Sequence, residues 1–290
     1  MPLGTGEAGG KAILFGEHFV LHGSPAIALP VSSRCVRVSL SANGSQGLSY
    51  DGPAEGRVVT LAMLTHLGLE HVRISLAGDL PLAAGLGSSA ALAVAIVRAT
   101  GVSDPDEVRV AAHQLEQIAH GRASGIDDAV ISYGTPLLFR PDAPPGARFI
   151  KLAFPAPPFW VAWVPRICST KESVARVATM AAAEPTRFGA LVAATTRIVS
   201  EGEGALRSGG HAQVGRLMNE AQAILDEIGV VVDSHRKLCE LGMRAGALGA
   251  KTTGAGGGGA VMFLGPAEME LDRVLAAAGF GHSFFAGEPH

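Results

Sequence analysis

The chain has 290 residues, of which 48% are apolar and 17% are charged, and its net charge is −3. This composition supports one large core or two smaller ones, and the lack of a basic tract excludes the electrostatic footprint of a nucleic-acid-binding protein. Three separated cysteines without a CxxC pair, and a start without signal-peptide character, indicate a reducing, cytoplasmic setting with buried thiols. Residues 80–97 carry no charge, but their proline, glycines and serines argue against a membrane-spanning helix.

The first part of the chain is predicted to alternate short strands with helices. Apolar residues recur with the period of two that is typical of half-buried strands, as at Val36, Val38 and Leu40. The predicted strands are residues 11–15, 35–41, 71–77, 129–133, 136–140 and 159–164. A helix is expected at about residues 56–67. A second helix should begin at Asp104, which is followed by proline and glutamate in helix-start order, and should stop at Gly121.

Beyond Pro165 the pattern becomes almost wholly helical up to about residue 245. The clearest amphipathic stripe has apolar residues at three- and four-residue spacing, namely Val214, Leu217, Met218, Ala221, Ile224, Leu225 and Ile228. Strands are expected again at residues 249–252, 260–264 and 282–285, with a helix near 268–278. This order predicts an α+β fold whose second half is ferredoxin-like. We place the domain boundary between residues 165 and 166.

One glycine-rich segment has the character of an anion site. The run Gly85-Leu86-Gly87-Ser88-Ser89-Ala90-Ala91 precedes an apolar, helix-forming stretch. Glycine lets the backbone approach an anion closely, and the free N–H groups and the dipole of a helix start favour phosphate. The segment lacks the Gly-Lys-Ser/Thr ending of a Walker A loop. Taken alone, it is also compatible with a glycine-rich loop capped by two serines.

Two further segments flank this glycine-rich run in the sequence: residues 11–28 (KAILFGEHFVLHGSPAIA) precede it and residues 251–260 (KTTGAGGGGA) follow it. In chain order, the three segments are called the first, second and third motif. Together the three segments resemble the three motifs of the GHMP small-molecule kinases, and the Lys-x-Ile-Leu-Phe-Gly-Glu-His run is most similar to the mevalonate kinases of that family. The resemblance spans residues 11 to about 264. It implies a nucleotide-binding N-terminal domain like domain 2 of ribosomal protein S5, residues 1–165, and a ferredoxin-like C-terminal domain, residues 166–290.

The third segment also allows a rival interpretation as a dinucleotide-binding fingerprint. That fingerprint should open a helix, whereas a strand is expected directly after this segment. We therefore expect its backbone N–H groups to face phosphate and acceptor instead.

Phosphoryl transfer needs a phosphate cradle, a divalent metal, a positive charge and a group that orients the accepting hydroxyl. The resemblance implies Asp127 as the catalytic carboxylate, Lys11 as the stabilising cation, and Ser89 and Glu116 as ligands of Mg²⁺. ATP is the implied co-substrate, held by Pro81, Ala84, Gly85, Leu86, Gly87, Ser88, Ser89 and Ala90. By pattern alone, Lys11 is a surface lysine, Glu116 a solvated helix residue and Asp127-Asp128 a polar turn.

The segment around Asp127 departs from the family pattern at two positions. Ala123 stands where the family usually has proline, and Asp128 stands where asparagine is common. Two adjacent buried carboxylates raise each other's pKa. We expect Asp128 to turn away from Asp127, because neighbouring side chains diverge.

The acceptor site follows from the same resemblance. Glu17 and His18 are implied to line it, together with Thr253, Gly254 and Ala255. Histidine can hydrogen-bond either a carboxylate or a hydroxyl of the acceptor, and its protonation state decides which. The remaining histidines show no zinc-ligand spacing.

We therefore expect a cytoplasmic enzyme that transfers the ATP γ-phosphoryl group to the C5 hydroxyl of (R)-mevalonate, in isoprenoid precursor synthesis and lipid metabolism. No nucleic-acid or membrane partner is expected, and a homodimer is compatible with this function. The alternative is a phosphomevalonate kinase or another GHMP kinase. A phosphorylated acceptor needs extra cations, for which Arg122 and Lys171 are candidates. A remote alternative is a non-catalytic sensor with the kinase fold, but such a protein could lose Lys11, Glu116 or Asp127, and all three are present.

Overall fold

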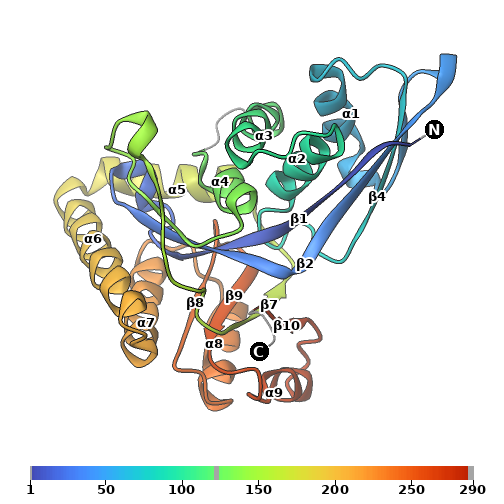
Figure 1. Ribbon diagram of the computed structural model, residues 1–290. Coiled ribbons are helices and arrows are strands. Elements are labelled where there is room, and N and C mark those ends of the chain that lie inside the picture. Colours follow the sequence, from blue (N-terminus) through green and yellow to red (C-terminus); the bar gives the residue numbers. More distant parts are fainter. Residues whose placement is uncertain (1, 121–123, 287–290) are drawn as a thin grey trace. The chain divides into compact units, whose positions relative to one another are not determined.

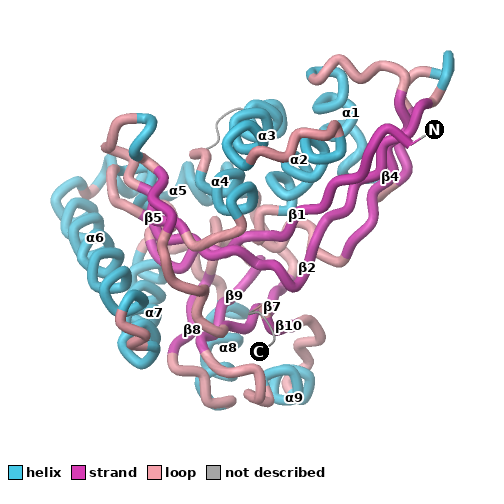
Figure 2. Tube along the Cα trace, in the orientation of Figure 1, coloured by secondary structure: helices cyan, strands magenta, loops and turns pink. Residues whose placement is uncertain are grey.

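Strands and helices make up most of residues 2–120 and 124–286, the parts of the chain that this computed structural model describes (Figure 2). The chain divides into two units that interleave along the sequence. The first unit holds Met1–Lys11, Pro30–Pro81 and Gly87–Gly134, and the second holds Ala12–Leu29, Leu82–Leu86 and Thr135–His290. The boundary expected at residue 166 concerns two consecutive domains, and it stays a prediction.

The sheet of the first unit is built on the long strand β2 (Ala26–Ala42). Its second half pairs antiparallel with β4 (Val72–Gly78), and β3 (Ser49–Asp51) pairs parallel with β4. Strand β1 (Pro2–Phe15) pairs with β2. The predicted alternation is confirmed, because the apolar residues at positions 36, 38 and 40 are buried and the polar residues at 37 and 39 are exposed.

Strand β1 is longer than the sequence predicts, because it begins at Pro2 rather than at Lys11. Its first half is rich in glycine, which has a low strand propensity and hides the pattern. The glycines have a packing reason. A Cβ on Gly6 would lie 2.1 Å from the carbonyl oxygen of Ala95, in helix α2 (Ser88–Ala99). The backbones of the strand and the helix therefore approach more closely than a side chain would allow.

The helices of the first unit pack against one another, α2 and α3 side by side and α4 against both (Figure 1). Besides α2 they are α1 (Arg57–His66), α3 (Pro105–His120) and α4 (Ile126–Tyr133). Asp104 caps α3 as predicted, since its Oδ1 accepts hydrogen bonds of 3.0 Å from the N–H groups of Asp106 and Glu107. The expected stop of α3 at Gly121 lies outside the described residues.

The strand predicted at residues 129–133 is wrong, because these residues belong to α4. Glycines in the left-handed conformation mark both ends of this helix: Gly125 has φ 83° and Gly134 has φ 62°. The β-branched Val130 and Ile131 suggested a strand, but they are buried in the helix. Tertiary burial here overrides their intrinsic strand preference.

The second unit contains a four-stranded antiparallel sheet in the order β10-β7-β9-β8. Its strands are β7 (Phe159–Val164), β8 (Gly249–Thr252), β9 (Gly259–Leu264) and β10 (Ser283–Phe285). Helices separate β7 from β8 and β9 from β10, which confirms the ferredoxin-like prediction. The shorter strands β5 (Leu137–Phe139) and β6 (Phe149–Lys151) pair with each other, and β5 pairs with the start of β2.

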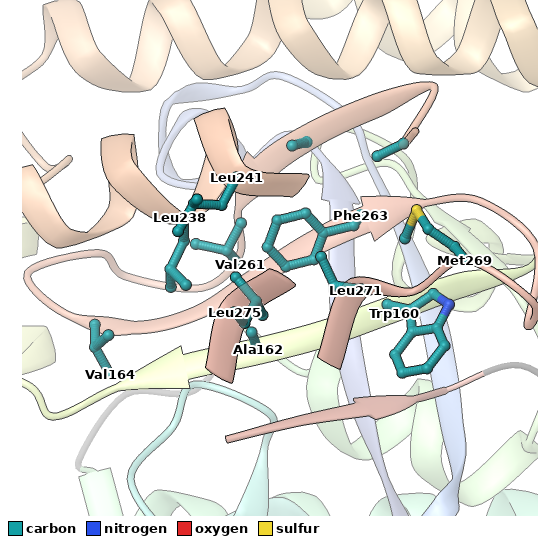
Figure 3. Close-up of a cluster of buried hydrophobic side chains, with 12 residues drawn as sticks. Trp160, Ala162, Val164, Leu238, Leu241, Val261, Phe263, Met269, Leu271 and Leu275 are labelled. Atoms are coloured by element: carbon teal, nitrogen blue, oxygen red, sulfur yellow. The ribbon is translucent and has the colours of Figure 1, made fainter. Parts of the chain in front are cut away.

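One core of this unit lies between the sheet and two helices, α8 (Asp233–Arg244) and α9 (Leu271–Ala277). Figure 3 shows the Phe263 ring among aliphatic side chains from both helices. The approach of α8 is close, because a Cβ on Gly242 would lie 2.1 Å from the Phe263 ring. This packing fixes β9, and with it the glycine-rich turn that precedes β9.

The predicted helical region is confirmed as α5 (Thr170–Ala183), α6 (Pro185–Arg207), α7 (His211–Glu227) and α8. Most of the predicted stripe in α7 is buried, and Leu225 and Ile228 join a second core with Phe19 and Phe188. The rings of Phe19 and Phe188 stack at 5.6 Å between centroids. This core anchors the short 3-10 helix at Phe19–His22, which lies within the segment of residues 11–28 that carries the first motif.

All three cysteines are free thiols. Cys35 is buried as expected, whereas Cys168 and Cys239 are partly exposed. Within the described ranges, no helix combines the length and the apolar character needed to cross a bilayer.

Candidate functional site

A buried cation and an accessible carboxylate meet in the first unit. Lys11 lies on β1 and is only 4% exposed, and its Nζ is 3.1 Å from Oδ2 of Asp127, which is 32% exposed. Asp127 is the second residue of α4, so the glycine that starts this helix also aims the carboxylate. The structure thus brings together the two residues predicted to be catalytic.

A second pair lies nearby, between helices α2 and α3. Ser89, at the start of α2, donates a hydrogen bond from its Oγ to Oε1 of the buried Glu116 on α3. Burial raises the pKa of Glu116 to about 7, and the charges of Asp127 and Asp128 raise it as well, against the opposing effects of the Ser89 hydrogen bond and of Lys11. The two pairs therefore belong to one electrostatic cluster.

The donor set of this cluster fits Mg²⁺. Hydroxyl and carboxylate oxygens are the ligands this ion prefers, and it usually takes one or two of them from protein and the rest from phosphate and water. Burial is the main cause of the raised pKa of Glu116, and the charges of Asp127 and Asp128 add to it against the single lysine, an excess of negative charge that a divalent cation would relieve. In the described part of the chain, no group of three or more His, Cys, Asp or Glu side chains could hold a metal by itself.

Gly87 makes room for Lys11. It precedes α2 with φ 71°, and a Cβ there would lie 2.9 Å from Cγ and 3.1 Å from Cε of Lys11. The aliphatic stem of the lysine thus passes directly over the glycine. Gly87 therefore leaves the space that the Lys11 side chain occupies, in addition to any role in phosphate binding.

Gly87→Ala should therefore lower kcat, because the new methyl group displaces the lysine. The positive φ alone should cost about 1–2 kcal/mol of stability. Gly101→Ala is the matched control, since Gly101 has φ 96° and nothing within 4 Å of its Cβ position. We expect similar losses of melting temperature for both variants and a loss of kcat for Gly87→Ala only. Equal kcat values in the two variants would contradict the contact with Lys11.

Asp128 faces a partner that the sequence analysis did not identify. It is 1% exposed, and its Oδ1 and Oδ2 lie 3.5 and 3.4 Å from Nδ1 of His113 on α3. Burial raises the pKa of Asp128, while His113 opposes that rise. The two residues are 15 positions apart on different helices, so no local pattern links them. The neighbouring segment 121–123, with Arg122 and Ala123, lies outside the described residues.

In the second unit, the third motif is joined to the first. Oγ1 of Thr253 accepts a 2.8 Å hydrogen bond from the N–H of Ile13 and donates one of 3.0 Å to its carbonyl oxygen. Lys251 and Glu17 form an ion pair in which the side chains are 0% and 2% exposed. Lys251 also donates to the carbonyl oxygen of Thr252 at 2.6 Å. The resemblance implies Glu17 at the acceptor, whereas the only signal for Lys251 in the sequence is a charge within a buried strand.

His18 is held against the third motif in an unusual conformation. Its φ of 60° is rare for a residue other than glycine, and such strain tends to occur at functional sites. Nε2 lies 3.1 Å from the carbonyl oxygen of Ala255, so Nε2 carries the hydrogen and donates it. Burial lowers the pKa of His18 to about 4, so the ring is neutral near pH 7. Nδ1 is then a hydrogen-bond acceptor.

The start of the glycine-rich anion segment and the residue before it also contact the third motif. The N–H of Ala260 donates to the carbonyl oxygen of Ala84 at 2.7 Å. A Cβ on Gly254 would lie 3.2 Å from the Gly85 carbonyl oxygen, so the two backbones are in close contact. Strand β9, and not a helix, follows the third motif, which supports the rejection of a dinucleotide-binding fingerprint.

His235 on α8 is a further buried residue that the sequence analysis left unassigned. It is 0% exposed, its Nδ1 lies 3.3 Å from Oγ1 of Thr252, and its Nε2 has no partner among the described residues. Burial lowers its pKa to about 4. The folded protein therefore resists protonating His235 and His18 at pH values where an unfolded chain would protonate both.

Stability should fall on acidification because of these two histidines. Each has a folded pKa of about 4 against a usual value of 6.5, so stability is complete above pH 6.5 and is lost as the pH falls toward 4. Between pH 7.5 and pH 5, each histidine should lower the free energy of unfolding by about 2 kcal/mol. In urea unfolding at pH 7.5 and pH 5, we expect His235→Leu to lose less unfolding free energy between the two pH values than the wild type, by the amount that His235 contributes. The variant of an exposed histidine, His66→Leu, is the control. An unchanged pH dependence in His235→Leu would contradict this assignment.

Comparison with known proteins identifies relatives over nearly the whole chain. Residues 56–135 match the model of the GHMP kinases N terminal domain, and residues 203–281 match that of the GHMP kinases C terminal domain. The mevalonate kinase of Thermococcus onnurineus is 30% identical, covering 94% of this chain and 92% of its own, and that of Archaeoglobus fulgidus is 33% identical, covering 89% and 91%. The crystal structure of L. major mevalonate kinase in complex with R-mevalonate is 27% identical, with a TM-score of 0.85, and covers 97% of this chain and 94% of that one.

Proposed function

Because the chain belongs to the GHMP kinase family, we propose that it is a mevalonate kinase, which transfers the γ-phosphoryl group of ATP to the C5 hydroxyl of (R)-mevalonate. The products would be 5-phosphomevalonate and ADP. Relatives that carry this name, from Thermococcus onnurineus, Archaeoglobus fulgidus and L. major, support the choice of acceptor.

One observation carries the proposal: Lys11, Ser89, Glu116 and Asp127 gather in the first unit although they come from four different elements. Lys11 pairs with Asp127, Ser89 bonds Glu116, and the pKa of Glu116 responds to both Lys11 and Asp127. These are the groups that phosphoryl transfer requires. A non-catalytic sensor has no need for such an arrangement.

The reaction assigns a task to each group. Asp127 orients the C5 hydroxyl and takes up its proton as the new O–P bond forms and the bond to the ADP oxygen breaks. The ammonium of Lys11 stabilises negative charge on the moving phosphoryl group. The first N–H groups of α2, at Ser88 and Ser89, bind phosphate oxygens. Ser89 and Glu116 would hold Mg²⁺, which when bound neutralises charge on the phosphates.

His18 would contact the acceptor through Nδ1. Since the neutral ring accepts a hydrogen bond at that nitrogen, a substrate hydroxyl suits it better than a carboxylate. Glu17 is engaged by Lys251, so its contribution to acceptor binding would be to hold the adjacent His18 in place. The backbone at Gly254 and Ala255 would complete the contacts to the acceptor and to the phosphate.

A coupled ADP-release assay with MgATP and a panel of acceptors tests this function. Mevalonate, phosphomevalonate, galactose and homoserine should be compared at equal concentration. We expect turnover with mevalonate far above the other three acceptors. Preference for phosphomevalonate would establish the alternative kinase, and binding of ATP without turnover on any acceptor would favour a sensor.

The oligomeric state and the cellular compartment are part of the same proposal. The function is compatible with a homodimer acting in the cytoplasm. Light scattering of the purified protein would give a mass near 29.6 kDa if the chain were instead monomeric.

A further inference from the structure

Side-chain contacts hold helix α4 against α3 at both ends of α4. At its last residue, the hydroxyl of Tyr133 donates a hydrogen bond to Oδ1 of Asp106 and accepts one of 3.1 Å from Nε of Arg109. Near its first residue, Nδ1 of His113 lies 3.5 and 3.4 Å from the two carboxylate oxygens of Asp128. Both helices and both sets of contacts belong to the first unit.

The contact near the start of α4 is the more buried of the two. Asp128 is 1% exposed, whereas Asp106 at the other end is exposed. Within the described ranges, Oδ2 of Asp128 accepts no hydrogen bond. A buried carboxylate without a partner is unfavourable. The nearby ring of His113 therefore matters more to Asp128 than a surface neighbour would.

Gln117 orients the ring of His113 for this contact. It lies one turn further along α3, and its Nε2 is 3.2 Å from Nε2 of His113. An amide nitrogen can only donate a hydrogen bond, so the neutral ring accepts at Nε2 and carries its hydrogen on Nδ1. Nδ1 is the ring atom that faces the carboxylate of Asp128.

The anchored carboxylate also determines where its neighbour points. Consecutive side chains on a helix diverge by about 100°. With Asp128 held against α3, Asp127 faces Lys11, whose Nζ is 3.1 Å from its Oδ2. Rotation of α4 about its axis would displace both carboxylates together. A displacement on the order of 1 Å is enough to slow a reaction that depends on alignment.

On the basis of the proposed function, we infer that His113 is a positioning residue for phosphoryl transfer. By anchoring Asp128 it sets the rotation of α4, and with it the place of the Asp127 carboxylate. His113 acts through Asp128 and not on a substrate. An asparagine at position 128, which is common in the family, would also offer an oxygen to Nδ1, so the anchor depends on the histidine more than on the charge of Asp128.

Steady-state kinetics of the full chain with MgATP and mevalonate, together with titration of ATP, tests this inference. His113→Leu should lower kcat about ten- to a hundredfold and leave the KM and the affinity for ATP within about twofold, because the α2 start is unchanged. His113→Asn is the conservative variant. Its amide nitrogen takes nearly the place of Nδ1 and still donates, so it should restore most of kcat.

Tyr133→Phe is the matched control for helix packing. It removes the hydrogen bonds at the far end of α4 and leaves the contact of His113 with Asp128 in place. Its kcat should stay near the wild-type value, even if its melting temperature falls.

The double variant His113→Leu/Asp128→Asn separates positioning from the effect of an unpaired charge. His113→Leu alone should melt several degrees below the wild type, because it leaves a buried carboxylate without a partner. The double variant removes that charge, so its melting temperature should recover. Its kcat should stay low, because the anchor is still missing. If His113→Leu does not fold, the double variant provides the kinetic result.

The outcomes separate this inference from the proposed function. Wild-type kcat in His113→Leu, or recovery of kcat together with stability in the double variant, would overturn the inference while the proposed function stands. An equal loss of kcat in Tyr133→Phe would also overturn it, since α4 would then need only general support. If the wild type prefers another acceptor of the panel, the proposed function is wrong, and the kcat ratio of variant to wild type on that acceptor still decides the inference. A wild type without turnover on any acceptor would overturn both.

Discussion

Replacing Asp127 with asparagine is expected to lower kcat by about 10²- to 10⁴-fold, the usual range for loss of a group that receives a proton in the transition state. Asparagine keeps the size of the side chain but can neither accept the hydroxyl proton nor pair with Lys11, which lies 3.1 Å away. The affinity for ATP should change little, because the α2 start and Glu116 remain in place. Steady-state kinetics with mevalonate, together with direct titration of ATP, would measure the two effects separately.

The adjacent position offers a matched control. Asp128→Asn removes a carboxylate that is also on α4 but is buried and faces His113. Because burial already disfavours its charge, this variant should keep kcat within a few-fold and should not lose stability at neutral pH. If Asp127→Asn retained near-normal turnover, or if Asp128→Asn were as damaging, the role assigned to Asp127 would be wrong.

The second large effect concerns stability. Lys251→Met should destabilise the protein by about 3–5 kcal/mol, because it leaves the Glu17 carboxylate buried without its partner. The carboxylate is 2% exposed, so water cannot replace the lysine. The double variant Glu17→Gln/Lys251→Met should recover most of the loss, since it removes the uncompensated charge together with the cation. Urea unfolding curves of the three proteins would give the values.

An exposed lysine supplies the comparison for this experiment. Lys237 on α8 pairs with Glu240 at 3.4 Å, and both side chains are about half exposed. Lys237→Met should therefore change stability by less than about 1 kcal/mol. A single Lys251 variant as mild as Lys237→Met, or a double variant as unstable as the single one, would show that the buried pair does not behave as a coupled unit.

Local sequence patterns accounted for the parts of the fold that depend on neighbouring residues. The alternation at residues 36–40, the capping aspartate at 104 and the stripe along α7 each arise within one element, and the structure confirms them. The strand predicted at residues 129–133 is wrong because the β-branched residues there lie in a buried helix. Glycines at both ends of this helix delimit it. The first half of β1 could not be predicted from local pattern, because its glycines are required by close packing against α2, about 90 positions later in the chain.

The candidate site likewise contains residues that the sequence predicts and interactions that only the folded chain reveals. Lys11, Ser89, Glu116 and Asp127 were identified through the resemblance of whole motifs, and their roles stay predictions while their proximity is now observed. The pairing of Glu17 with Lys251 joins residues 234 positions apart. Neither this pair nor the raised pKa of Glu116 has any trace in local sequence, because both result from burial that only the folded chain creates.

The interleaving of the two units limits how this gene can be divided. The chain passes between them after Lys11, Leu29, Pro81, Leu86 and Gly134, so no single truncation yields either one whole. A fragment that starts at residue 166 would lack β7, the strand that β9 and β10 both flank. Chimeras with related kinases, or split-reporter halves, would therefore need junctions at every crossing, and simple halves should be recovered as insoluble or protease-sensitive polypeptides.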